Sequence, residues 1–250
     1  MRAGEISGES GRSDAYWIEA PEQAISAPDA SGRQSILSPM GGVRHVAIAG
    51  NMGVGKSTLT RVLSARLGAP AYFETVHDHP YLERFYQDMK RWSFQSQFFF
   101  LSQAFSQHCD ILRSDVTCIQ DRTIYEHFHV FASSLHAQGL LEDDDFEVLG
   151  DHYRSLTAVV PGPDLMIYLR ASVPTLLERI NTRDRNCESS VTYEYLQELE
   201  ERYERWMSQY EASDVLVIDT ENIDIHDAAQ RDTLLDMIES RIEERALAVA

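Results

Sequence analysis

The chain has 250 residues, of which 43% are hydrophobic and 10% aromatic, which is enough for a folded core and argues against wholesale disorder. Asp and Glu outnumber Lys and Arg by 40 to 22, and the net charge of −18 argues against nucleic-acid binding, because so acidic a surface repels phosphate. No apolar run approaches the about 20 residues of a membrane-spanning helix. We therefore expect a folded domain that binds neither nucleic acid nor a membrane.

Residues 1–42 are rich in Gly, Ser, Ala and Pro and show no periodicity, which predicts a disordered tail. The tail lacks the apolar segment of a secretory signal, and its acidic residues are not typical of a transit peptide. Met40 directly precedes GGVRHVAIAG, so a start codon at Met40 is an attractive explanation of the tail. The expected domain is residues 43–250.

The three cysteines are widely spaced and odd in number: Cys109, Cys118 and Cys187. Their spacing fits neither a disulfide framework nor a zinc site. We therefore expect a reducing, cytoplasmic setting.

From residue 43 onward, short apolar runs alternate with longer helical patterns. Each run has the length of a strand and is apolar on both faces, as parallel strands buried under helices are. The runs are RHVAIAG (44–50), AYFE (71–74), VTCIQD (116–121), DLMIYL (164–169) and DVLVID (214–219). This alternation predicts an α/β fold with a five-stranded parallel sheet flanked by helices.

Two of the intervening segments have apolar residues three and four positions apart, which predicts amphipathic helices. In residues 91–113 these are Phe94, Phe98, Leu101, Phe105, Cys109 and Leu112. In residues 193–210 they are Leu196, Leu199, Tyr203 and Trp206.

The string GNMGVGKST matches the phosphate-binding loop G-x-x-x-x-G-K-[ST], and it stands between an apolar strand and an amphipathic helix that Gly68 would cap. Glycines let backbone N–H groups surround a phosphate, and the helix N-terminus adds a positive dipole end. Lys56 would contact the β- and γ-phosphates, and the Ser57 hydroxyl would bind Mg²⁺. The candidate phosphate-binding residues are Gly50, Asn51, Met52, Gly53, Val54, Gly55, Lys56, Ser57 and Thr58. The alternative is a glycine-rich turn without a ligand.

A phosphate loop indicates a nucleoside triphosphate without naming the reaction. The N-K-x-D motif of GTPases is missing, since the nearest string, NTRD at 181–184, lacks the lysine. An ABC-type signature is also missing. The domain from Met40 onward has the size of a small-molecule kinase.

Two further clusters indicate where the acceptor binds. Asp121 and Arg122 end the third apolar run, at the edge of the sheet where α/β proteins place their ligands. Arg179, Arg183 and Arg185 follow the fourth run, and such arginines can close over a transferring phosphoryl group as a lid. The alternative for the arginines is surface salt bridging.

These strings together resemble the deoxynucleoside kinases, most closely the bacterial deoxyadenosine/deoxyguanosine kinase branch, over about residues 44–225. The resemblance rests on GNMGVGKST, FETVHDHPYLERFYQDMKRWSFQSQ, QDRTIYEHFHVFA and RINTRDRNCE, in the family's order. It implies a P-loop kinase with an arginine-rich lid. The implied reaction is the ATP- and Mg²⁺-dependent phosphorylation of a deoxyribonucleoside on its 5′-hydroxyl, with purines favoured.

The resemblance also assigns roles on the acceptor side. Glu74 matches the carboxylate that takes the proton from the 5′-hydroxyl, although this chain has Glu74-Thr75-Val76 where the family usually has Glu-Pro-Val. Tyr86 and Glu188 match the pair that holds the sugar 3′-hydroxyl. Gln97 matches the glutamine that pairs with the base edge, and Phe131 an aromatic that packs on the base.

On the phosphate side, Arg122 matches an arginine that contacts the phosphates and the Glu74 region. Asp121 matches its acidic partner, which in some descriptions accepts the proton or lies near Mg²⁺. Arg179, Arg183 and Arg185 match the lid. The family commonly forms homodimers, for which Met89, Trp92 and Phe98–Phe100 supply apolar surface.

Two positions depart from the family pattern. Many relatives have an arginine and an aspartate that pair beside the base, and this chain has Ala104 and His127 in their places. Because both partners change together, no charge is left unpaired, and His127 becomes a candidate nucleoside-binding residue. Two alternative functions remain: a nucleoside monophosphate kinase, and a non-catalytic nucleotide-binding regulator.

Overall fold

The computed structural model describes residues 42–76, 78–182 and 191–249. Its sheet has five parallel strands in the order β2-β3-β1-β4-β5, which confirms the predicted architecture. The strands are β1 (His45–Gly50), β2 (Ala71–Tyr72), β3 (Cys118–Asp121), β4 (Leu165–Arg170) and β5 (Asp214–Asp219). Nearly all of the expected tail, residues 1–42, lies outside the described residues.

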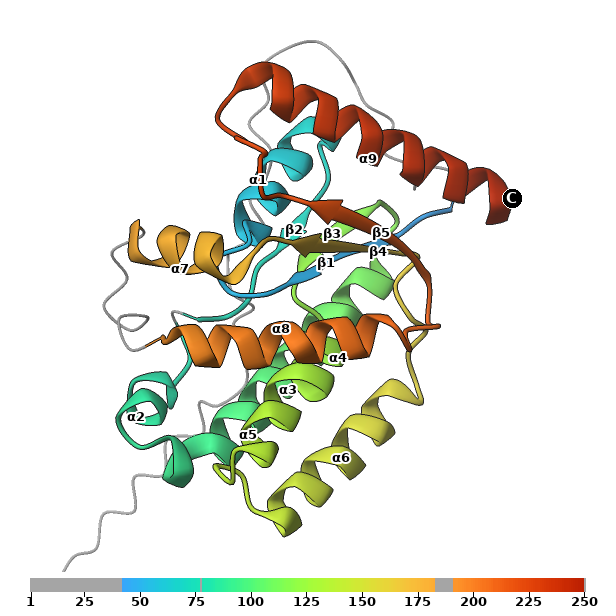
Figure 1. Cartoon of the computed structure of the whole chain (residues 1–250). Coiled ribbons are helices and arrows are strands. Elements are labelled where there is room, and N and C mark those ends of the chain that lie inside the picture. Colours follow the sequence, from blue (N-terminus) through green and yellow to red (C-terminus); the bar gives the residue numbers. More distant parts are fainter. Residues whose placement is uncertain (1–41, 77, 183–190, 250) are drawn as a thin grey trace, which may run out of the picture.

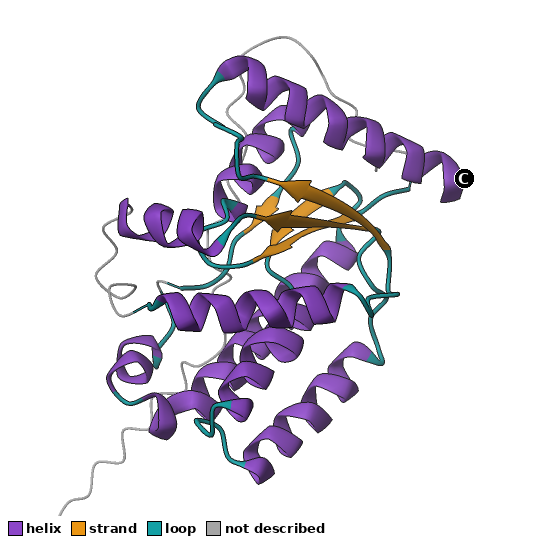
Figure 2. Ribbon diagram, viewed as in Figure 1, coloured by secondary structure: helices purple, strands orange, loops and turns teal. Residues whose placement is uncertain are grey.

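Helices cover both faces of the sheet, as Figures 1 and 2 show. One face is covered by α1 (Lys56–Leu67) and α9 (Ala228–Val249), with α7 (Val173–Thr182) at its edge. The helices near the other face are α2 (Leu82–Gln87), α3 (Met89–Arg113), α4 (Ile124–Glu126), the π-helix η1 (His127–Ala132), α5 (Ser133–Ala137), α6 (Asp143–Thr157) and α8 (Tyr193–Met207). No helix in the described ranges is long and apolar enough to cross a membrane.

The sheet separates two apolar cores. Along β1, Val46 and Ile48 belong to the core beneath α1 and α9, whereas Ala47 and Ala49 belong to the core beneath α3 and α8. Successive side chains of a strand point to opposite faces, so a central strand with helices on both sides is apolar at every position. This is why the apolar runs in the sequence located the strands.

The two amphipathic helices differ in how well their patterns predict burial. In α8 the stripe Leu196, Leu199, Tyr203 and Trp206 is buried, as expected. In α3 the predicted stripe is fully buried only at Leu101, and the other buried residues are Ser93, Ser96, Gln97, Ala104, His108 and Ile111. Phe98, in the apolar stripe, is 41% exposed. The buried face of α3 thus mixes polar and apolar residues, which the apolar stripe did not predict.

The carboxyl ends of β1, β2 and β3 meet at one edge of the sheet. The phosphate loop follows β1, Glu74 lies two residues after β2, and Asp121 ends β3. The parallel topology therefore brings together residues that are far apart in the sequence.

Candidate active site

The phosphate loop connects β1 to α1 through three glycines with positive φ: 142° at Gly50, 81° at Gly53 and 106° at Gly55. This backbone curls around the Lys56 ammonium, whose Nζ donates to the carbonyl oxygens of Gly50, at 2.7 Å, and Asn51, at 3.0 Å. Burial, followed by the nearby Arg122 charge, lowers the pKa of Lys56 to about 8. The helix N-terminus and the lysine provide a site for an anion.

The loop residues differ in what they offer a phosphate. The Asn51 side chain donates to the carbonyl of Leu196 and the carboxylate of Glu200, both at 3.0 Å, so it ties the loop to α8. Val54 is 2% exposed and packs in the core, which leaves only its backbone for a ligand. Both remain candidate phosphate-binding positions through their backbone amides.

Gly50→Ala is expected to destabilise the fold more than Gly55→Ala. A Cβ at Gly55 meets nothing within 4 Å, so its cost is the positive φ alone, about 1–2 kcal/mol. A Cβ at Gly50 would lie 2.5 Å from the carbonyl oxygen of Leu169, and this overlap adds about 1–3 kcal/mol. Urea unfolding of the two variants measures the difference, and equal midpoints would contradict it.

At the end of β3, Asp121 faces the first turn of α1. The Ser57 hydroxyl donates to Asp121 Oδ2 at 2.5 Å. Asp121 is 2% exposed, and its other carboxylate oxygen, Oδ1, has no hydrogen-bond partner. Two oxygen-bearing side chains thus meet beside the phosphate loop.

Arg122 is the most constrained residue of the site. It is the one residue other than glycine with a positive φ, 72°, in the described part of the chain, which is typical of strain held at functional sites. Its Nε lies 3.3 Å from Glu74 Oε2 and 3.8 Å from Glu126 Oε1. The guanidinium carbon lies 4.1 Å from the centre of the Phe131 ring. Burial would lower the pKa of Arg122, but the carboxylates, led by Glu74, outweigh burial and raise it.

Glu126 is a component of the site that the sequence analysis missed. It is fully buried, accepts a short hydrogen bond from the Tyr203 hydroxyl, and lies 3.4 Å from the Gly50 amide nitrogen. Burial raises its pKa, while Arg122 and Lys56 oppose that shift. The spacing of four residues between Arg122 and Glu126 indicates that the two side chains can pair along a helix. The contacts of Glu126 with β1 and α8 depend on the tertiary structure and have no signal in the sequence.

A cavity of about 100 Å³ lies against these groups. Its lining contains Met52, Gly53, Lys56, Ser57, Glu74, Tyr86, Gln97, Arg122, His127 and Phe131, all of which were candidates from the sequence. The lining also contains Tyr195, which the sequence analysis missed because α8 begins far from the other motifs. Burial raises the pKa of Tyr195 to about 12.

Two polar side chains on the cavity wall are deeply buried. Gln97 is 3% exposed, and its Oε1 has no hydrogen-bond partner. His127 is also 3% exposed and stacks on Phe100 with ring centres 5.0 Å apart. Burial, followed by the Arg122 charge, lowers the pKa of His127 well below its usual value. The wall therefore presents an unpaired amide oxygen and a neutral imidazole.

The expected lid is only partly described. Arg179, on α7, donates to Thr220 Oγ1 at 3.1 Å and to the Thr220 carbonyl at 2.7 Å. Arg183, Arg185 and Glu188 lie outside the described residues. Their roles therefore stay predictions from the sequence.

Comparisons with known proteins show which family this chain is similar to. Residues 46–243 fit the family model described as deoxynucleoside kinase. A Bacillus subtilis deoxyadenosine/deoxycytidine kinase is 36% identical over 202 residues, covering 80% of this chain and 93% of that protein. A Dictyostelium discoideum deoxyadenosine kinase is 42% identical over 163 residues, covering 65% of this chain and 66% of that protein.

Solved structures agree with the sequence relatives. The structure of a deoxyadenosine kinase from M. mycoides with dCMP and dCDP bound has a TM-score of 0.70 and 28% identity, covering 78% of this chain and 99% of that one. The family expected from the motifs is thus confirmed, and so is the reaction class. The chain belongs to the deoxynucleoside kinase family and is a phosphotransferase that phosphorylates deoxynucleosides.

Proposed function

We propose that this kinase transfers the γ-phosphoryl group of ATP to the 5′-hydroxyl of a deoxyribonucleoside, with purine deoxynucleosides favoured. The observation that carries the proposal is the shared cavity, which places Glu74 and Lys56 on the walls of one space. A carboxylate and a phosphate-binding lysine around one cavity are what in-line transfer to a hydroxyl requires. Relatives named deoxyadenosine kinase and deoxyguanosine kinase support the purine preference.

The phosphate donor is held by the loop backbone and Lys56. The Lys56 ammonium donates to two backbone carbonyls, which leaves one of its three N–H donors for a phosphate. Arg179, Arg183 and Arg185 are proposed to close over the transferring group and stabilise its charge. The Arg179 bonds to Thr220 anchor that segment beside the end of β5.

The acceptor is held by the opposite wall. Glu74 takes the proton of the 5′-hydroxyl, and Arg122 holds the Glu74 carboxylate in place through the 3.3 Å contact. Tyr86 and Glu188 are proposed to bind the sugar 3′-hydroxyl. Phe131, which is fixed beneath the Arg122 guanidinium, packs on the base.

The base edge is proposed to meet Gln97 and His127. The free Oε1 of Gln97 accepts from an exocyclic amine, and the amide nitrogen donates to a ring nitrogen, which is the pairing that adenine offers. A neutral His127 contributes one donor and one acceptor, unlike the charged pair of many relatives. We infer that Gln97 and His127 recognise the base by its pattern of hydrogen-bond donors and acceptors, without a charged side chain.

Mg²⁺ is proposed as the cofactor at Ser57 and Asp121. Their side-chain oxygens meet at 2.5 Å, and Asp121 Oδ1 is buried without a partner, which fits a hard cation that prefers oxygen ligands. No group of three or more metal-ligating side chains occurs within the described ranges, as expected of an ion held partly by substrate phosphates. The ion would neutralise charge on the phosphates.

Removing Mg²⁺ with EDTA is expected to abolish turnover. Ser57→Ala is expected to raise the Mg²⁺ concentration needed for half-maximal rate by about tenfold, because the variant loses one contact to the ion. Rates measured over a magnesium titration test this. Ser102→Ala, which removes an exposed α3 hydroxyl bonded to the Phe98 carbonyl, is the control and should behave as wild type. Identical titrations for both variants would contradict the site.

A homodimer in the cytoplasm is the proposed state. Phe98 of α3 is 41% exposed and stacks on His152 of α6, and Val148 of α6 is 53% exposed, so these two helices share an apolar outer face. Phe99 and Phe100, which were also expected there, pack instead against His79. Sedimentation of wild type and Val148→Asp tests the dimer, which should dissociate in the variant.

Incubation with Mg-ATP and each of the four deoxynucleosides tests the reaction and the base preference. Monophosphate formed from deoxyadenosine or deoxyguanosine ahead of deoxycytidine and thymidine is the expected result. A preference for pyrimidines would overturn the purine assignment. Product from nucleoside monophosphates alone would move the acceptor assignment to a monophosphate kinase.

A further inference from the structure

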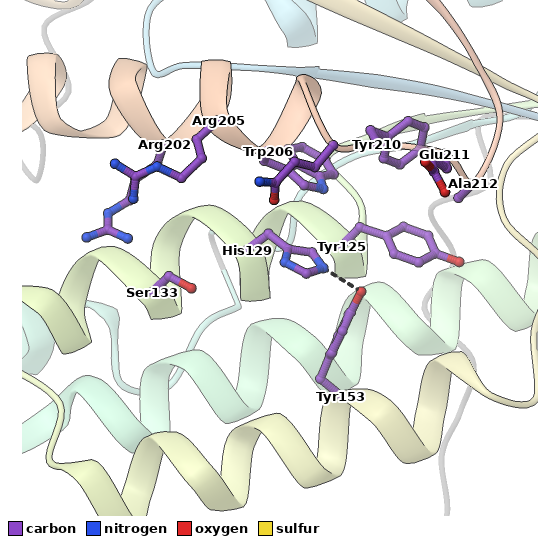
Figure 3. A pocket seen from close by; sticks show the side chains of 11 residues that line it. Tyr125, His129, Ser133, Tyr153, Arg202, Arg205, Trp206, Tyr210, Glu211 and Ala212 are labelled. Carbon is purple, nitrogen blue, oxygen red and sulfur yellow. Dashed lines mark hydrogen bonds between the residues drawn. The ribbon is translucent and has the colours of Figure 1, made fainter.

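A second, larger cavity of about 410 Å³ lies between η1, α6 and the C-terminal end of α8 (Figure 3). None of the residues that line it lines the active-site cavity. Its volume is within the range of small-molecule sites. The reaction described above uses none of its side chains.

The cavity has aromatic walls that are held in place. Trp206 and His129 stack at 6.1 Å between ring centres, and Tyr210 meets the edge of Trp206 at 5.6 Å. His129 Nε2 is 2.9 Å from the Tyr153 hydroxyl, as Figure 3 shows. Rigid rings of this kind bind a planar ligand with little loss of side-chain entropy.

The polar groups lie at opposite ends of the cavity. Arg202 and Arg205 are at one end and Glu211 is at the other (Figure 3). Arg202 forms a short ion pair with Glu198, whereas Arg205 has no ion pair among the described residues. Arg205 is exposed to solvent, so its guanidinium at the end of an aromatic cavity is available to an anionic ligand.

We propose that this cavity is a second binding site, for a nucleotide. The base lies on the wall formed by Trp206 and Tyr210, the phosphate binds at Arg205 and Arg202, and Glu211 accepts from a donor at the far end of the ligand. The choice of a nucleotide among aromatic anions rests on the proposed function, because the product of that reaction is a nucleoside monophosphate.

The cavity shares two elements with the active site. η1 carries His127 toward the nucleoside cavity and His129 toward the second one. α8 carries Tyr195 at the active site and Arg205 at the second site, and between them Tyr203 bonds to Glu126. π-Helical turns are frequent at functional sites. A ligand in the second cavity would therefore contact the same two helices, η1 and α8, that shape the nucleoside site.

Calorimetric titration with dAMP tests the proposal. The titration is done in the presence of a saturating concentration of the deoxynucleoside that the enzyme phosphorylates best, which occupies the nucleoside site. Wild type is expected to keep one dAMP site per chain. Arg205→Gln should weaken that site by about tenfold or more, the value of a charge-assisted hydrogen bond. Arg113→Gln, which removes an exposed arginine of α3, is the charge-matched control and should bind as wild type does.

Three outcomes decide between the possibilities. Residual dAMP binding that is lost in Arg205→Gln and kept in Arg113→Gln supports the second site. Complete displacement of dAMP by the deoxynucleoside in wild type overturns it, and so does unchanged binding in Arg205→Gln. Because Arg205 is outside the active site, the variant should still phosphorylate its deoxynucleoside. Failure of the proposed function would instead appear as no turnover in wild type.

Discussion

Glu74→Gln is expected to lower kcat by about 10²–10⁴-fold, the contribution of a positioned general base. Glu74 lines the active-site cavity, 3.3 Å from the Arg122 guanidinium, which keeps the carboxylate oriented. Glutamine has nearly the same shape and keeps an oxygen beside the Arg122 guanidinium, but it cannot take a proton from the 5′-hydroxyl. Steady-state rates with Mg-ATP and the preferred deoxynucleoside measure the loss.

The KM values separate catalysis from binding in this variant. Since the proposed role of Glu74 is to take the proton in the transition state, the KM for ATP should stay within about threefold of wild type while kcat falls. Glu83→Gln removes an exposed carboxylate of α2, close in the sequence but outside the cavity lining, and serves as the control. A Glu74→Gln enzyme that turns over as fast as the Glu83→Gln enzyme would refute the assignment.

The parts of the fold that the sequence predicted are those set by local patterns. All five strands were located by their apolar runs. A parallel strand under two layers of helices is apolar on both faces, and β1 illustrates this with every residue buried, whereas the edge strands β2 and β5 are only partly buried. The phosphate loop was found because two glycines, Gly50 and Gly55, and Lys56 occur at the fixed spacing of the motif, and both glycines have positive φ. Gly68, expected as the cap of α1, has the left-handed φ of 63°.

The parts that the sequence did not predict depend on contacts between distant elements. The apolar stripe of α3 suggested a buried face, yet Ser93, Ser96 and Gln97 are buried while Phe98 is exposed. Ser93 donates to the Met89 carbonyl, Ser96 lies within hydrogen-bond distance of His79, and Gln97 lines the active-site cavity. Periodicity alone does not distinguish such a polar buried face from a surface.

The role of α8 shows the same limit. Its apolar stripe was predicted correctly, but its polar contacts were not. Glu200 holds Asn51 of the phosphate loop, and Tyr203 bonds to Glu126 beside Arg122. These partners are separated by 149 and 77 positions, so no local spacing records them. α8 thus connects the phosphate loop, the acceptor wall and the second cavity.

Acidification below pH 6.5 is expected to destabilise the fold through two buried histidines. His45 and His108 are 2% and 0% exposed and their rings meet at 4.6 Å. Burial lowers the pKa of His45 to about 3, with the neighbouring His108 adding to the shift, and burial lowers the pKa of His108 to about 4. Both start from 6.5, so below pH 6.5 the unfolded chain binds protons that the folded chain does not.

The sign and size of the effect follow from this difference. The stabilisation from keeping these histidines neutral is complete above pH 6.5 and is lost as the pH falls toward their folded-state pKa values. By pH 5 each histidine lowers the free energy of unfolding by about 2 kcal/mol. The free energy of unfolding should therefore drop by about 4 kcal/mol between pH 7 and pH 5 from this pair, a large share of a typical domain's stability.

His108→Phe isolates one half of the drop, because it keeps an aromatic ring against His45 and removes one titrating group. The variant should lose about 2 kcal/mol less than wild type between pH 7 and pH 5, as measured by urea unfolding at both values. His226→Gln, which removes an exposed histidine from the loop before α9, is the control and should follow wild type. If acidification lowered the free energy of unfolding equally in His108→Phe and His226→Gln, the buried pair would not be the cause. The loss of stability would then have to come from the protonation of other buried histidines, such as His79 and His127.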